Sequence, residues 1–185
     1  PSTELPQACA TPVNCPFATP NPPAPVRPAL DSLLIPFRSQ PPAPRLREGY
    51  RLVADGLPSP AALNRLLLAS GDRARDAERW QRVLERSIWH LAVESSEGEL
   101  VGFVRATSDL ALNANLWDLC SDPADPAQGE ILAVLVHGAL GRLRRELAGC
   151  SISLSAPPEA LAALERHGFA VDPGGIRAMG LRLET

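Results

Sequence analysis

The prolines of this chain are distributed very unevenly. Thirteen of the 20 prolines lie in residues 1–48, and none of the 13 glycines does. Proline fixes φ and donates no backbone hydrogen bond, so such a stretch favours extended polyproline II backbone over helix or sheet. We therefore expect an extended proline-rich arm over residues 1–48, followed by a folded part over residues 49–185. A folded part of that length forms one domain.

The arm contains one apolar stretch, Leu30 to Phe37, with five large apolar side chains. Contiguous apolar side chains are unfavourable in water, so we expect this stretch to pack on something. Two outcomes are open: it packs on the chain's own folded domain, or it binds a partner protein as a linear motif. A protein partner would bind through residues 26–45. The start at Pro1 fits the removal of an initiator methionine or of a longer leader, and the sequence does not distinguish the two.

Charge and composition exclude several functions. The net charge is −3, divided as +1 in the arm and −4 in the domain, so we expect no nucleic-acid binding. The longest uncharged apolar run, residues 131–136, is far too short to span a bilayer. All 18 basic residues are arginines, which excludes a Schiff-base lysine or a P-loop lysine.

The four cysteines, Cys9, Cys15, Cys120 and Cys150, are too few and too scattered for a disulfide framework. Five residues separate Cys9 from Cys15, and no histidine is near them, so the spacing does not match a zinc site. We expect no metal, and a reducing compartment.

Hydrophobic periodicity and turn residues predict the order of elements in the domain. The order is β-α-α-β-β-β-α-β-α-β-β. Ser59 and Pro60 are typical of a helix start, and Glu97 and Gly98 of a hairpin turn. The expected strands are 51–54, 88–93, 100–106, 115–120 and 151–155, with a last pair at Phe169 and 177–183. Four helices are expected. The first begins at Ser59, and the other three cover residues 76–85, 128–147 and 158–166.

Three strings add to this order: VGFVRATSD at 101–109, NANLWD at 113–118, and HGF at 167–169 followed by DPGGIRAM at 172–179. Together they resemble the GNAT superfamily of acetyl-CoA-dependent N-acetyltransferases, in particular its cyanobacterial and chloroplast branch. The resemblance covers residues 50–183 and leaves the arm outside. It implies an α+β (α/β/α) fold, in which about four helices flank a mixed, mostly antiparallel sheet. It also implies a cyanobacterial-type cytoplasm or a plastid stroma.

The resemblance implies an acetyl-CoA site between the fourth and fifth strands, where the pantetheine pairs like an extra strand. The diphosphate would bind the amides at the start of the next helix. The family signature there is Gln or Arg, two residues, Gly, one residue, then Gly or Ala. The implied cofactor-binding residues are Leu119, Cys120, Ser121, Gln128, Gly129, Ile131, Leu132 and Ala133.

Two positions depart from the family pattern. Ile131 stands where the signature has its central glycine, and we expect its branched side chain to project into the phosphate space. Leu164 stands where many members have the tyrosine that protonates the departing thiolate. Glu130 adds a negative charge beside the same loop. Water, Cys120 or His167 would have to supply the proton instead.

Asp118 is the candidate catalytic residue, because it follows Trp117 on the fourth expected strand, at the implied cleft. The alternatives for Asp118 are a cap or a salt bridge with Arg105. Cys120 is a possible nucleophile, although a strand cysteine is more often a small core residue.

Two functions follow from these residues. The first is an acetyl-CoA-dependent N-acetyltransferase with an unknown amine acceptor, whose activity is weak or lost because of Ile131 and Leu164. The alternative is a non-catalytic binding or scaffold subunit of the same fold, attached to a larger assembly through its proline-rich arm.

Overall fold

The computed structural model describes residues 43–173. A sheet of five strands in the order β1-β2-β3-β4-β5 forms its centre. Neighbouring strands are antiparallel from β1 to β4, and β4 and β5 are parallel. The strands are β1 (Arg51–Ala54), β2 (Trp89–Glu94), β3 (Leu100–Ser108), β4 (Asn113–Ser121) and β5 (Ser151–Leu154).

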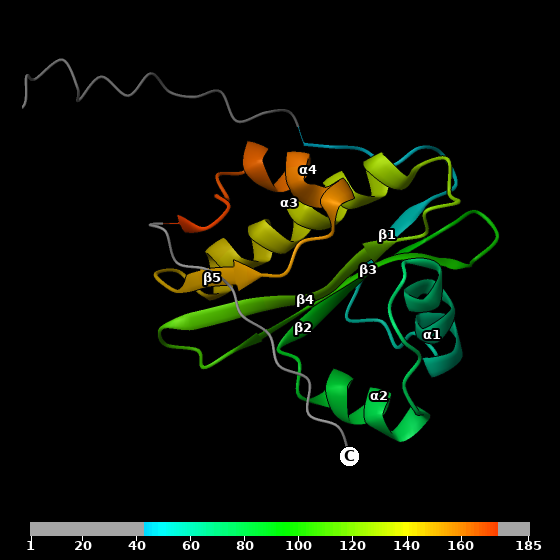
Figure 1. The fold of residues 1–185 in the computed structure, drawn as a ribbon, viewed down its shortest axis with the longest axis horizontal. Coiled ribbons are helices and arrows are strands. Elements are labelled where there is room, and N and C mark those ends of the chain that lie inside the picture. Colours follow the sequence, from blue (N-terminus) through cyan, green and yellow to red (C-terminus); the bar gives the residue numbers. More distant parts are fainter. Residues whose placement is uncertain (1–42, 174–185) are drawn as a thin grey trace, which may run out of the picture. The chain divides into compact units, whose positions relative to one another are not determined.

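Helices cover both faces of this sheet, with α3 and α4 on one face and α1 and α2 on the other (Figure 1). The predicted α+β architecture, a mostly antiparallel sheet with four helices, is confirmed. The helices are α1 (Pro60–Ala69), α2 (Ala77–Glu85), α3 (Gln128–Glu146) and α4 (Leu161–Arg166), which the short 3₁₀ helix η2 (Pro158–Ala160) precedes.

Local sequence explains the helix starts. The Ser59 hydroxyl accepts a hydrogen bond from the Ala62 amide, with Pro60 at the first helical position, as predicted. Asp76 caps α2 in the same way, because its carboxylate accepts from the Arg79 amide at 2.6 Å. Each cap satisfies an amide that has no partner inside its helix.

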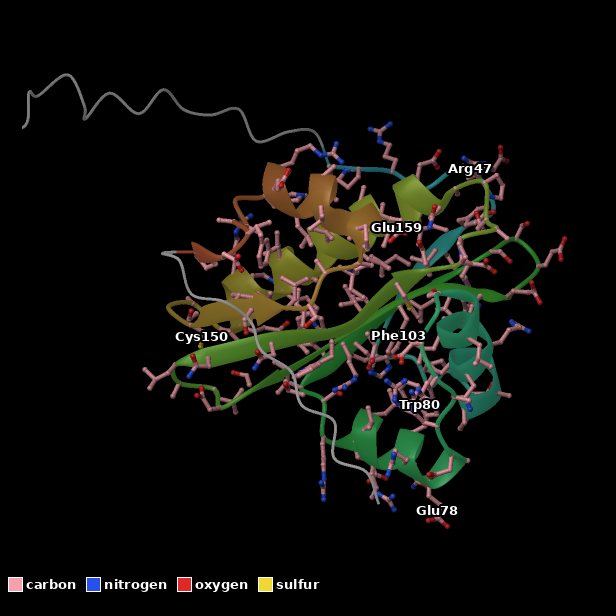
Figure 2. All side chains as sticks on the ribbon, viewed as in Figure 1. Arg47, Glu78, Trp80, Phe103, Cys150 and Glu159 are labelled. Atoms are coloured by element: carbon pink, nitrogen blue, oxygen red, sulfur yellow. The ribbon has the colours of Figure 1, made fainter. Side chains whose placement is uncertain are left out.

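Two apolar clusters fill the space between the sheet and its helices. The larger cluster joins α3 and α4 to the sheet, and the smaller one joins α1 and α2 to it. In the smaller cluster Trp80 of α2 and Phe103 of β3 meet edge to face, with 6.5 Å between ring centroids (Figure 2). Burying aromatic rings of this size is a major source of stability.

The last pair of strands that the sequence predicts is not confirmed. The strand predicted at Phe169 is wrong: the residue lies in a loop after α4, partly buried against the larger cluster. Its predicted partner, residues 177–183, lies outside the described residues, as does nearly all of the arm, including residues 26–42. Within residues 43–173, no helix is both long and apolar enough to cross a membrane.

Candidate functional site

Strands β4 and β5 pair over only half of β4. The pairs run from Asn113 with Ser151 to Leu116 with Leu154, where β5 ends. The second half of β4, from Trp117 to Ser121, pairs with β3 but not with β5. The two parallel strands therefore part, as the sequence resemblance implied, and no strand within residues 43–173 pairs with this edge of β4.

The parting coincides with a bulge in β4. Arg105 of β3 is opposite Trp117, but Phe103, two residues away, is opposite Cys120, three residues further along β4. β4 therefore has one extra residue at this point. Asp118, which lies in the bulge, has a positive φ of 54°. Such bulges bend a strand and increase its twist.

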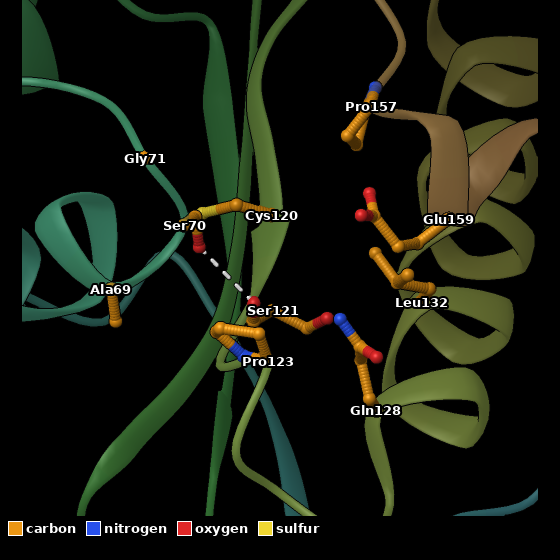
Figure 3. A pocket seen from close by; sticks show the side chains of 10 residues that line it. All are labelled: Ala69, Ser70, Gly71, Cys120, Ser121, Pro123, Gln128, Leu132, Pro157 and Glu159. Atoms are coloured by element: carbon orange, nitrogen blue, oxygen red, sulfur yellow. Dashed lines mark hydrogen bonds between the residues drawn. The ribbon is translucent and has the colours of Figure 1, made fainter.

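A cavity of about 310 Å³ opens beside the unpaired half of β4 (Figure 3). Cys120 and Ser121 of β4 line one side, and Gln128 and Leu132 of α3 line another. The end of α1, the loop between β4 and α3, and the segment after β5 complete it. These further lining residues are Ala69, Ser70, Gly71, Pro123, Pro157 and Glu159.

Ser121 presents polar groups at this cavity. The Asp122 amide donates to the Val101 carbonyl of β3, so the neighbouring Ser121 backbone faces the opposite, cavity side. Its carbonyl accepts from the Ser70 hydroxyl at 3.1 Å, and its own hydroxyl is buried with no hydrogen-bond partner among the described residues. In Figure 3 the side chains of Ser121 and Gln128 point toward one another. A buried hydroxyl without a partner fits a ligand that carries hydrogen-bonding groups.

The first turn of α3 supplies amide donors near the cavity. No described residue accepts a hydrogen bond from the Gly129 or Glu130 amide, and no side chain caps this helix. Free amides and the positive end of the helix dipole favour an anion at such a place.

Ile131 does not obstruct this turn. Its side chain is fully buried and packs on Gly102 of β3, on the sheet side of α3. The expectation that it projects into the phosphate space is therefore wrong. Its amide is also engaged, because it donates to the Ala127 carbonyl at 2.9 Å.

Arg47 pairs with the charge of Glu130. The Arg47 guanidinium lies 2.9 Å from one Glu130 carboxylate oxygen and also donates to the Pro126 carbonyl at 3.0 Å. The hydrogen bond from Arg47 lowers the pKa of Glu130. Arg47, at the end of the predicted arm, thus offsets the negative charge at the start of α3.

Asp118 is bound in ion pairs. Its carboxylate lies 2.6 Å from Arg105 Nε and 3.6 Å from Arg75 Nη2, and its side chain is 10% exposed. The salt bridge with Arg105, one of the alternatives that the sequence left open, is therefore present. The Asp118 carboxylate is thus engaged by two guanidinium groups, and it is not among the residues that line the cavity.

Cys120 is a core residue on the α1 side of the sheet. Burial raises the pKa of its thiol to about 12. The thiolate is the reactive form of cysteine, so a thiol of this kind is a weak nucleophile. It would also be a poor proton donor to a CoA thiolate, whose own acid is stronger.

Leu164 and His167 lie away from this cavity. Leu164 is 2% exposed and lines a second cavity of about 510 Å³ between α4 and β5, which residues 169–173 also border. His167, at the end of α4, has its ring centroid 5.7 Å from that of His137 on α3. Burial, followed by the charges of His137, Arg144 and Arg166, lowers the pKa of His167.

Of the predicted cofactor residues, Cys120, Ser121, Gln128 and Leu132 line the cavity. Leu119 is buried in β4 between the bulge and Cys120, and Gly129 and Ala133 follow in the first turns of α3. Sequence reasoning missed Ser70, Gly71, Pro157 and Glu159, which reach the cavity from α1 and η2 through tertiary folding. Within residues 43–173, no three histidine, cysteine or acidic side chains group as metal ligands would.

Comparison with known proteins identifies relatives by sequence, although no protein-family model matches the chain. Serotonin N-acetyltransferase 2, chloroplastic, of Oryza sativa is 35% identical over 124 residues, which cover 64% of this chain and 60% of that protein. GCN5-related N-acetyltransferase 2, chloroplastic, of Arabidopsis thaliana is 36% identical over 86 residues, 46% of this chain and 33% of that protein. The chain thus spans less than two thirds of the length of these relatives.

Solved structures share the fold. A probable acetyltransferase of Staphylococcus aureus superposes with a TM-score of 0.62 at 14% identity, over 72% of this chain and 99% of that one. A GNAT-family N-acetyltransferase of Escherichia coli in complex with CoA gives 0.52 at 20% identity, over 72% and 73%.

Proposed function

We propose that this chain, whose fold and sequence relatives are those of the GNAT-family N-acetyltransferases, is itself an acetyl-CoA-dependent N-acetyltransferase. The observation that carries the proposal is the parting of β4 from β5, with a cavity beside the unpaired edge of β4 and the start of α3. This is one continuous arrangement of an open strand edge and free helix amides. It suits a long ligand with an amide-bearing arm and an anionic end.

The thioester arm would lie along Leu119, Cys120 and Ser121. The Ser121 amide faces the cavity, and its buried hydroxyl is available to a ligand amide. A strand edge of this kind binds an extended ligand through main-chain hydrogen bonds, as in the addition of a β-strand.

The anionic end would lie at the first turns of α3, near Gln128, Gly129, Leu132 and Ala133. The donors there are the free amides of Gly129 and Glu130, and the Gln128 side chain lines the cavity. The Ile131 amide is not among them. Glu159, the one charged residue among the described residues that line the cavity, would oppose an anionic ligand.

Acetyl-CoA would supply an acetyl group activated as a thioester, which an amine attacks to form an amide and release CoA. In this proposal the chain holds the thioester in place and supplies no general acid. Its single tyrosine, Tyr50, is hydrogen-bonded to Asp125, and burial raises its pKa. A thiol has a pKa of about 8.5, so CoA can leave as a thiolate and then take its proton from water.

The acceptor is an amine of unknown structure. The relatives include proteins named as a serotonin N-acetyltransferase and a histone acetyltransferase, so the acceptors in their names differ widely. Their chloroplastic names support a plastid stroma or the corresponding cyanobacterial compartment.

The second candidate is a non-catalytic binding subunit of the same fold. Leu164 favours it, because a buried leucine with no proton to donate stands where the resemblance expects an acid. Such a subunit would attach to its assembly through residues 26–45 of the arm.

One experiment separates the two functions. Calorimetric titration with acetyl-CoA measures binding, and a thiol reagent measures CoA release in the presence of an amine mixture that includes serotonin and a lysine peptide. Micromolar or tighter binding with amine-dependent thiol release supports the enzyme. Binding without release supports the non-catalytic subunit, and absence of binding contradicts the enzyme.

A further inference from the structure

Asp118 has a backbone conformation that most residues avoid. Its φ of 54° lies in the left-handed region, within the bulge where β4 leaves β5. Glycine adopts this region freely, asparagine and aspartate tolerate it, and other L-residues are strained there. Something must therefore hold the bulge in place.

The Asp118 side chain is held on two sides. Arg105 of β3 lies 2.6 Å from one carboxylate oxygen, and Arg75 of the α1–α2 loop lies 3.6 Å from the other. The exposed fractions are 10% for the Asp118 side chain and 15% for that of Arg105. Charge-assisted bonds with so little water are stronger and better oriented than surface pairs.

Arg75 is itself fixed. Asn64 of α1 accepts from the Arg75 amide at 2.9 Å and donates to the Arg75 carbonyl at 2.7 Å. The Arg75 guanidinium lies over the Trp80 ring, 5.1 Å from its centroid. The α1–α2 loop is thus joined to the bulge through a rigid arginine rather than a mobile surface side chain.

We propose that Asp118 is a positioning residue. The ion pairs with Arg105 and Arg75 hold its backbone left-handed, and the resulting bulge directs the edge of Leu119 to Ser121 away from β5 and into the cavity. The role of this edge in binding CoA rests on the proposed function. The control of the bulge by Asp118 does not.

Two variants isolate the backbone effect. Asp118→Gly and Asp118→Ala both remove the carboxylate, but only alanine is strained at a positive φ. We expect Asp118→Ala to bind CoA roughly tenfold more weakly than Asp118→Gly, measured by calorimetry. Asp118→Asn, which keeps the backbone preference but loses the ion pairs, should bind CoA close to Asp118→Gly and more weakly than the parent protein. Affinities of these two variants equal to that of the parent would overturn the role of the ion pairs. Equal affinities for the glycine and alanine variants would overturn the proposal. If Asp118→Ala does not fold, Asp118→Ser replaces it in the same comparison.

Asp55 provides a matched control. It is an aspartate with a φ of 52° and lies 2.7 Å from Arg142, but it does not line the cavity. Asp55→Ala should lower stability without changing CoA affinity. A similar loss of CoA affinity in Asp55→Ala would show general loosening of the fold and overturn the proposal.

A second readout needs no ligand. Amide hydrogen exchange, resolved by NMR, should be faster from Trp117 to Ser121 in Asp118→Gly than in the parent protein, because the ion pairs are lost. It should be faster still in Asp118→Ala, where the backbone is also strained. An unchanged pattern in Asp118→Ala would contradict the positioning role even if CoA binds. If the parent protein binds no CoA, only the proposed function fails, and the exchange comparison still decides the role of Asp118.

Discussion

Ile131 of α3 packs directly on Gly102 of β3, so closely that a Cβ atom at Gly102 would collide with the Ile131 Cγ2 methyl. Ile131 is fully buried, and Leu135, one turn later, also contacts this glycine. The missing side chain at Gly102 allows α3 to lie close to the sheet, next to the pair that Gly102 forms with Ser121 of the cavity.

Gly102→Ala should therefore destabilise the domain. The added methyl group overpacks a well-filled core, which costs about 1–3 kcal/mol, and urea unfolding measures it. The Gly102→Ala/Ile131→Ala double variant should lose less stability than the sum of the two single variants, because each change relieves the other. Gly129→Ala is the control, since its Cβ would meet nothing within 4 Å. Additive losses would contradict the packing account.

The Ile131→Gly variant should be less stable than the parent protein. It should not bind CoA more tightly. Removing a fully buried isoleucine and adding a helical glycine together cost about 3–5 kcal/mol of unfolding free energy. Thermal unfolding and CoA titration check the two halves of this prediction. Tighter CoA binding in the variant would restore the idea that this side chain obstructs the phosphate space.

Glu159→Gln should bind CoA about two- to threefold more tightly than the parent protein, because it removes a carboxylate that lines the cavity. The gain should shrink as salt is added, because salt screens exposed charges. Glu165→Gln on α4, which borders the other cavity, is the control and should change nothing. An equal effect of both variants would mean that only net charge matters.

Asp109 should make the loop between β3 and β4 sensitive to acid. Its carboxylate accepts from the backbone amides of Asn113, Leu112 and Ala111 at 2.8–2.9 Å, and these bonds lower its pKa well below the usual range. A lowered pKa in the folded state means that the carboxylate stabilises the fold above about pH 4, and that this stability is lost as the pH falls further.

The comparison of Asp109→Asn with the parent protein checks this. The variant should be less stable at pH 7, and its disadvantage should narrow between about pH 4 and pH 2. A disadvantage that stays constant over this range would show that ionisation of Asp109 does not stabilise the loop.

The sequence predicted the architecture because periodicity and caps determine it locally. Ser59 and Pro60 begin α1 as expected, and the five strands lie within two residues of their expected bounds. Trp117 and Asp118 fall at the parting of β4 from β5. The direction of the Ile131 side chain was not predictable, because a signature aligned by spacing says nothing about which side of α3 faces the sheet. The binding of Asp118 by Arg75 was not predictable either, since that contact joins a loop to a strand 43 residues away.

The most direct test of the account is an NMR titration of the full chain with CoA, which follows assigned backbone amides. The account predicts saturable shifts at Leu119 and Ser121 of β4 and at Gly129 and Glu130 of α3. Saturable shifts that instead lie along α4 and the outer edge of β5, or no shifts at millimolar CoA, would contradict it.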